Sequence, residues 1–226
     1  MIRLERVSVS HPRRGGRRHV LRELSLTLPR GRSLAVLGGP GTGKSTLLGV
    51  ISGVLRPDSG RVTREVRVSA PLGKAGGVHN AMTARQHLRF AARVHGAEPE
   101  ALIADARALC GLGPWLDVPL GAWSHAMRAR LAFAVWLHAP TEVRVVDDLA
   151  GLGDDAFRPR ALEALERRLA EGDVVMVSRS PARLRAHCDC AVLLGAGPPR
   201  AFDDLEEGLD ALREADRHPR LPELSE

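Results

Sequence analysis

The sequence predicts an α/β fold with a mostly parallel β-sheet flanked by helices, antiparallel N-terminal strands and an inserted helical subdomain. Short apolar segments alternate with helical segments after residue 140, which is the pattern of a parallel sheet. The first segments alternate apolar and polar residues, as half-buried strands do. From 83 to 140 the apolar period is helical instead, and this stretch separates the two regions of strand pattern.

Turn residues separate the elements expected in the N-terminal region. Pro29 and Gly31 end the second alternating segment, and another turn is predicted at 56–60. We expect strands at 2–7, 24–28 and 33–37, a helix from 44 to about 52, and more strand at Val62, Val66 and Val68.

The remainder of the chain is expected to add three strands and several helices. Gly96, the segment 111–114 and Gly121 interrupt the helical subdomain of 83–140. We expect strands at 143–146, 174–177 and 191–194, helices near 155–171 and after Pro181, and a tail from 202 to 226 with one helix and a frayed end from 219. The whole chain, 1–226, is expected to form a single domain.

The composition favours a cytoplasmic protein. No apolar run approaches the ~18 residues that cross a bilayer, and the N-terminus lacks a secretory signal. Cys110, Cys188 and Cys190 match neither a secreted disulfide framework nor a zinc site, so we expect reduced thiols. A metal site at 187–190 would lack its second pair of ligands.

The positive charge of the chain is a weak signal. A net charge of +6 would suit an anionic partner such as nucleic acid or a membrane face. Its densest patch, Arg13, Arg14, Arg17 and Arg18, predicts a solvated hairpin turn between two strands, with contact to lipid or a partner as the alternative.

A phosphate-binding loop follows the third expected strand. The motif G-x-x-x-x-G-K-[ST] is matched, between a strand and a helix, by Gly38, Gly39, Pro40, Gly41, Thr42, Gly43, Lys44 and Ser45. The glycines let backbone N–H groups approach phosphate oxygens, and the helix N-terminus adds a partial positive charge. Lys44 is expected to bridge the β- and γ-phosphates of ATP, and Ser45 to ligate Mg²⁺. The sequence therefore predicts a P-loop NTPase core.

Two acidic residues end a later apolar strand. Asp147 is expected to serve Mg²⁺, and Asp148 to orient or deprotonate the attacking water. Two aspartates after a strand are usually ordinary loop residues when they stand alone. Their presence with a P-loop in the same chain favours the catalytic interpretation.

From residue 1 to about 194, the chain resembles the ATP-binding subunits of ABC transporters. The segments 41–48 and 56–60 are similar to the family's P-loop and the chain that follows it. The polysaccharide-exporting type, which serves capsule and O-antigen systems, is suggested by the segments 76–79, 82–85, 123–131 and 151–154.

The resemblance implies a head-to-tail dimer, either of two copies or of one copy with a paralogous subunit. Ser124 and Ala126 would belong to the signature motif that covers ATP on the partner's P-loop. Thr46 would bind the nucleotide together with the P-loop residues. It also implies a separate membrane permease, received around 77–85, and hence a peripheral location on the inner face of the cell membrane.

Five positions differ from the pattern of the family. Ala126 replaces a signature glycine, His79 replaces the Q-loop glutamine, Asp148 replaces the catalytic glutamate, Arg179 replaces the switch histidine, and His11 replaces the adenine-stacking aromatic residue. An imidazole can still stack on adenine. An aspartate is shorter than a glutamate, and an arginine cannot relay a proton at neutral pH.

These differences leave two functions open. Either ATP hydrolysis drives polysaccharide export through the permease, or a non-hydrolysing, regulatory subunit acts as a nucleotide-driven dimer clamp. A DNA-associated ABC ATPase would carry a long coiled-coil insertion or zinc modules, and a nucleotide kinase would carry an acceptor-base pocket with a lid. The sequence contains none of these features, so no nucleic-acid partner is expected.

Overall fold

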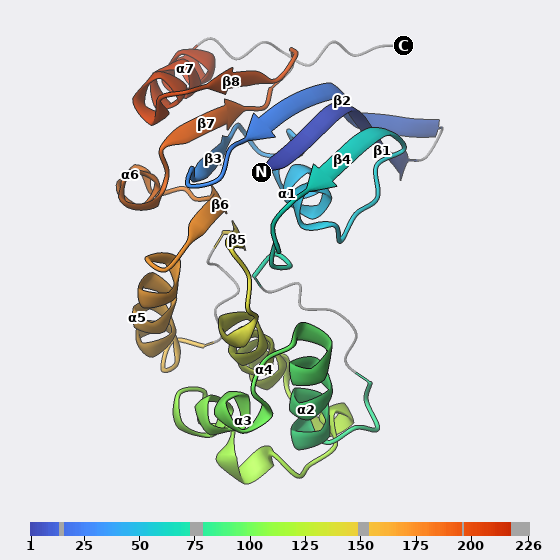
Figure 1. Cartoon of the computed structure of the whole chain (residues 1–226), viewed down its shortest axis with the longest axis vertical. Coiled ribbons are helices and arrows are strands. Elements are labelled where there is room, and N and C mark those ends of the chain that lie inside the picture. The colour runs from blue at the N-terminus through green and yellow to red at the C-terminus, as the bar shows by residue number, and fades with distance from the viewer. Residues whose placement is uncertain (14–15, 73–78, 149–153, 196, 218–226) are drawn as a thin grey trace.

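Two sheets and a group of helices make up the structure. The computed structural model describes residues 1–13, 16–72, 79–148, 154–195 and 197–217. Figure 1 shows both sheets in its upper part and the helices α2 to α4 below them. This arrangement confirms the predicted α/β fold, its antiparallel N-terminal strands and its helical subdomain.

The smaller sheet is antiparallel, with the strand order β2-β1-β4. Its strands are β1 (Ile2–Arg13), β2 (Gly16–Leu28) and β4 (Ser59–Arg64). Both β1 and β2 extend beyond the predicted 2–7 and 24–28, because the two strands continue to pair as far as Arg13 and Gly16. Most side chains of this extension are exposed, so its sequence lacks the apolar alternation on which the prediction depended.

The strand predicted around Val62 is shorter than expected. It ends at Arg64, so Val66 and Val68 lie outside it. Val68 forms only an isolated parallel bridge with Val143. Both valines are partly buried against the core, which explains their apolar character without strand pairing.

The larger sheet has the strand order β5-β6-β3-β7-β8. Its strands are β3 (Leu34–Leu37), β5 (Val143–Asp147), β6 (Asp173–Val177), β7 (Cys190–Leu193) and β8 (Arg200–Phe202). The first four run parallel, and β8 pairs antiparallel with β7 at one edge. Strand β8 was not predicted, since three residues are too few to show a period.

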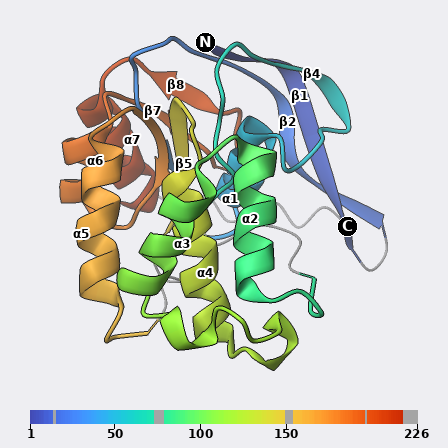
Figure 2. The same ribbon diagram turned by 60° about the horizontal axis from the view of Figure 1, so that its bottom comes forward.

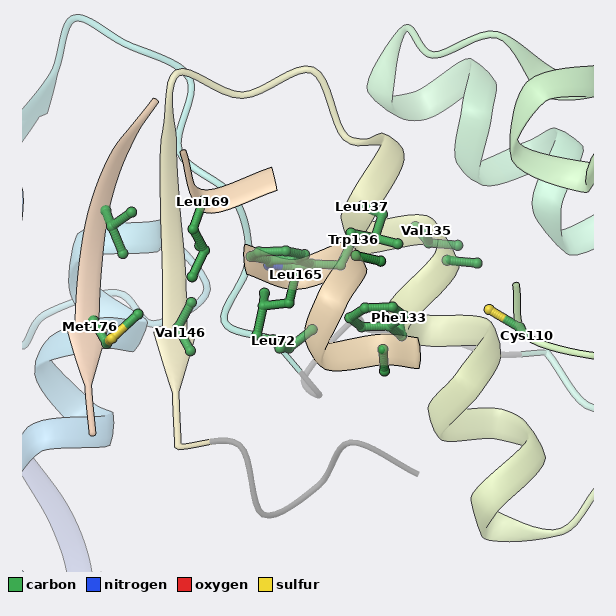
Figure 3. Packing of buried hydrophobic residues seen from close by; sticks show 14 of the residues in the cluster. Leu72, Cys110, Phe133, Val135, Trp136, Leu137, Val146, Leu165, Leu169 and Met176 are labelled. Atoms are coloured by element: carbon green, nitrogen blue, oxygen red, sulfur yellow. The ribbon is translucent and has the colours of Figure 1, made fainter. Parts of the chain in front are cut away.

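Each face of the larger sheet contributes to a different core. Leu34 and Val36 point to a core shared with the antiparallel sheet and α1 (Lys44–Ser52), whereas Ala35 and Leu37 point to the opposite core. This second core includes α5 (Arg158–Leu169), α6 (Pro181–His187) and α7 (Leu205–Arg217). It also continues into the helical subdomain, as Figure 3 shows.

Three helices and two 3-10 turns form the helical subdomain. They are α2 (Ala84–His95), α3 (Pro99–Ala108), η1 (Gly113–Trp115), η2 (Leu120–Ala122) and α4 (His125–His138). A capping box joins Thr83 and Gln86 at the start of α2, and Gly96 ends this helix in a left-handed conformation with φ 69°. Helix α4 contacts α5 where the subdomain meets the rest of the chain, and Figure 2 shows α2, α3 and α4 grouped to one side of α5. Within the described ranges, no helix is long and apolar enough to span a membrane.

Candidate active site

The P-loop connects β3 to α1, and two of its glycines, Gly38 and Gly43, are sterically required. Gly38 has φ 138°, and a Cβ atom there would lie 2.3 Å from the carbonyl oxygen of Leu194. Gly43 has φ 100°, and its Cβ would lie 2.6 Å from Val20 Cγ1. Gly43 is also the N-cap of α1 and offers no side-chain cap, so the first N–H groups of the helix remain available to an anion.

The ammonium group of Lys44 lies over the P-loop. Its Nζ donates hydrogen bonds to the carbonyl oxygens of Gly38 and Gly39, at 2.8 and 2.6 Å. Burial lowers the pKa of Lys44, while the charge of Asp147 raises it and that of Arg179 lowers it. A partly buried cation therefore faces the loop in which the sequence predicts phosphate binding.

Asp147, Asp148 and Arg179 come together because β5 and β6 are parallel neighbours. Asp147 ends β5 and pairs with Val177, the last residue of β6. Asp148 follows in a left-handed conformation with φ 45°, and its N–H donates to the carbonyl of Val177 at 3.3 Å. Arg179 Nε lies 3.4 Å from Asp148 Oδ2.

These residues share one edge of the sheet with the P-loop. Strand β3 lies beside β6, and the carboxyl ends of parallel strands meet at the same sheet edge. The electrostatic influence of Asp147 and Arg179 on Lys44 agrees with this placement. Asp148 and Arg179, which stand at the positions of the catalytic glutamate and the switch histidine, thus form an ion pair with each other. This ion pair was not predicted from the sequence.

The β1–β2 hairpin also reaches the P-loop region. His11 Nε2 lies 3.0 Å from the hydroxyl of Thr46, on the first turn of α1. Arg18 Nη2 donates to the carbonyl of Gly41 at 3.2 Å. Arg18 lies on β2 beside the predicted solvated turn, and its contact with Gly41 was not predicted. The pairing of His11 with Arg18 across the hairpin was the signal that could have found it.

The chain matches known ATP-binding proteins over almost its full length. The family model for ABC transporters matches residues 21–150. The polysialic acid transport ATP-binding protein KpsT of Escherichia coli is 32% identical over 92% of this chain and 97% of its own. The capsule polysaccharide export ATP-binding protein CtrD of Neisseria meningitidis serogroup B is 31% identical over 93% of this chain and 97% of its own. The chain belongs to the ABC transporter family.

Solved structures of ABC transporter proteins have the same fold. The ATP-binding subunit of one ABC transporter has a TM-score of 0.70 at 20% identity, over 94% of both chains. A dimeric bacterial ABC transporter cassette has a TM-score of 0.65 at 16% identity, over 86% of this chain and 94% of its own. At these identities the likeness supports the fold alone.

The residues matching the ABC signature motif lie apart from the P-loop of their own chain. Ser124 caps α4 by accepting a hydrogen bond from the N–H of Met127 at 3.2 Å, and Ala126 lies in the first turn of the helix. In Figure 1, α4 lies among the lower helices and α1 among the upper elements. No hydrogen bond or ion pair between described residues connects Ser124 or Ala126 to the P-loop.

His79, the residue at the ABC Q-loop position, makes no hydrogen bond or ion pair with the P-loop within the part of the chain that the structure describes. Its side chain is exposed, and its carbonyl accepts the N–H of Met82 at 3.0 Å in the turn before α2. The preceding segment 76–78 and the segment 151–153 lie outside the described residues.

The three cysteines, and His187 before the start of β7, are held in the fold by burial or by a contact with a neighbouring helix. Cys110, Cys188 and Cys190 are free and buried, and burial raises the pKa of Cys110 and Cys188 to about 12. His187 Nε2 lies 2.5 Å from Glu166 Oε2 on α5. Across the described ranges, no group of three or more His, Cys, Asp or Glu residues is placed to hold a metal.

Proposed function

We propose that this chain binds and hydrolyses ATP to energise the export of a polysaccharide through a separate membrane permease. The observation that carries the proposal is the cluster of Lys44, Asp147, Asp148 and Arg179 at the P-loop edge of the sheet. The class of substrate follows from the relatives, which are named as ATP-binding proteins for polysialic acid transport and capsule polysaccharide export.

In this proposal the P-loop holds the phosphates of ATP. The N–H groups at the start of α1 and the Lys44 cation face the phosphate chain. Mg²⁺ would be held by Ser45 and Asp147, because hydroxyl and carboxylate oxygens are its preferred ligands, and it would offset charge on the transferred phosphoryl group. His11, held beside Thr46, would stack on the adenine.

We further propose that hydrolysis is slow. Asp148 orients the attacking water in this scheme, but its carboxylate is one methylene shorter than glutamate and lies beside the Arg179 guanidinium. Arg179 cannot exchange a proton at neutral pH, so it acts only as a cation that can hold the γ-phosphate. His79 would stand in place of the glutamine that senses Mg²⁺ in the family.

The active unit is proposed to be a head-to-tail dimer on the inner face of the cell membrane. Ser124 and Ala126 of each subunit would then cover ATP on the other subunit's P-loop, which fits their distance from their own P-loop. The permease would dock around residues 77–85, of which the structure describes 79–85, where the exposed Asn80 precedes the capped start of α2. A cysteine placed at Asn80 should crosslink to a cytoplasmic loop of the permease, whereas crosslinking only from Arg17 would refute this surface.

ATP binding can be tested by thermal unfolding. A ligand that binds only the native state stabilises it by about 2.7 kcal/mol at a hundredfold excess over Kd. Millimolar Mg-ATP should therefore raise the thermal midpoint of the unmutated protein. Lys44→Ala should remove most of the shift, and Arg22→Ala, which removes a cation from an exposed position on β2, should retain it. An unchanged midpoint in the unmutated protein would defeat the proposed ATP site.

A further inference from the structure

We propose that Arg18 is a nucleotide-binding residue whose guanidinium pairs with the phosphate chain of ATP or ADP, as a cation additional to Lys44. This inference rests on the proposed ATP site. It adds a residue from the antiparallel sheet to a site otherwise built from the ends of the parallel strands.

The hairpin places Arg18 over the P-loop. Arg18 on β2 is the cross-strand partner of His11 on β1. The His11 ring meets Thr46 on the first turn of α1, and the Arg18 guanidinium meets the Gly41 carbonyl in the loop itself. The paired residues therefore contact both the loop and the helix that together are proposed to enclose the phosphates.

The neighbouring Arg17 holds the hairpin in this position. Its Nε donates to Ser10 Oγ at 2.7 Å, and its Nη2 donates to Asp58 Oδ1 at 2.9 Å. Ser10 donates both its N–H and its hydroxyl to Asp58 Oδ2, each at 2.7 Å. Because successive side chains of a strand point to opposite faces, Arg17 is directed to Asp58 and Arg18 to the P-loop.

The hydrogen bond that Arg18 makes leaves most of its donors for a ligand. A guanidinium has five N–H donors, and among the described contacts Arg18 uses one, toward a neutral carbonyl. A phosphate is a stronger partner, since it accepts charge-assisted and often bidentate hydrogen bonds from arginine. The first turn of α1 contains no acidic residue that would compete for the guanidinium.

Titration of a fluorescent mant-labelled ATP or ADP, with Mg²⁺, tests this role on the full chain. Arg18→Ala should weaken binding of both nucleotides about tenfold, the lower range for a hydrogen bond to a charged group at an exposed site. Arg18→Lys should give an intermediate Kd. Arg22→Ala removes the same charge from an exposed position on the same strand and should leave Kd unchanged. The thermal midpoint of Arg18→Ala without nucleotide should equal that of the unmutated protein.

Two results would overturn the inference. One is a Kd for Arg18→Ala equal to that of the unmutated protein, and the other is equal weakening by Arg22→Ala, which would show only a general effect of charge. Lys44→Ala separates this failure from that of the ATP site. If Lys44→Ala abolishes binding and Arg18→Ala does not affect it, only the role of Arg18 is wrong. If Lys44→Ala leaves Kd unchanged, the ATP site and the role of Arg18 fail together.

Discussion

Replacing Asp148 by glutamate and Arg179 by histidine, the residues usual in the family beside the attacking water, should accelerate hydrolysis. Asp148 Oδ2 lies 3.4 Å from Arg179 Nε, so the carboxylate is both short and directed toward a cation. A misplacement of ~1 Å can reduce a rate on the order of 100-fold. The double variant Asp148→Glu with Arg179→His should therefore raise kcat by about 10- to 100-fold, equivalent to about 1.4 to 2.7 kcal/mol of barrier.

The ion pair is exposed enough for this variant to remain folded. The side chain of Arg179 is 93% exposed and that of Asp148 38%, and exposed pairs contribute less than about 1 kcal/mol to stability. Loss of the ion pair alone should lower the thermal midpoint by no more than about 4 °C for a chain of this length, and the measured midpoint of each variant shows whether it is folded. Changes in rate can therefore be interpreted as catalytic effects.

Steady-state phosphate release by the unmutated protein, both single variants and the double variant would test the prediction. Each single change should have a smaller effect than the double change, because both side chains act on one water and one phosphate, and ATP affinity should vary little. If the unmutated protein already turns over at ~1 s⁻¹ or faster, within the usual range for enzymes, the reasoning is refuted. A double variant no faster than the unmutated protein would refute it equally.

Four further changes have expected outcomes. Ala126→Gly should strengthen ATP-dependent dimerisation in light scattering, because it removes a methyl group from the proposed approach to the partner's γ-phosphate. Thr83→Ala should lower the free energy of unfolding in urea by about 1 kcal/mol, through loss of the α2 capping box. Gly38→Ala should abolish the Mg-ATP shift in thermal midpoint, because its Cβ would lie 2.3 Å from a carbonyl oxygen. The hydrogen bond from Arg130 holds the pKa of Asp154 below its usual value. The ionised Asp154 carboxylate therefore stabilises the folded state above its unfolded pKa of about 3.9, and this stabilisation is lost as pH falls through the folded pKa. Asp154→Asn should therefore lower the thermal midpoint at neutral pH and reduce its further fall below about pH 4.

The P-loop was predictable because its requirements are local. A tight turn at positive φ requires glycine at Gly38 and Gly43, and the strand before it and the helix after it have clear periods. The same holds for the buried strand that ends at Asp147, whose apolar residues are continuous in the sequence.

The features that the sequence did not reveal depend on how the strands pair with one another. The outer halves of β1 and β2 pair although their exposed side chains show no apolar alternation, and this pairing brings Arg18 to Gly41. The contact between Asp148 and Arg179 depends on the parallel register of β5 with β6, which neither segment specifies alone. Local patterns therefore predicted the elements, and the register between them decided the additional contacts.

The apolar core that runs from the larger sheet into the helical subdomain limits how the two parts can move. Val146 and Met176 on the sheet, Leu165 on α5, and Phe133 and Trp136 on α4 belong to one cluster, and Figure 3 shows α5 between the sheet and α4. These five side chains are buried, each at most 3% exposed. Rotation of α4 relative to the P-loop would have to proceed by small sliding of packed side chains, a shear motion, because a hinge would open this cluster to water.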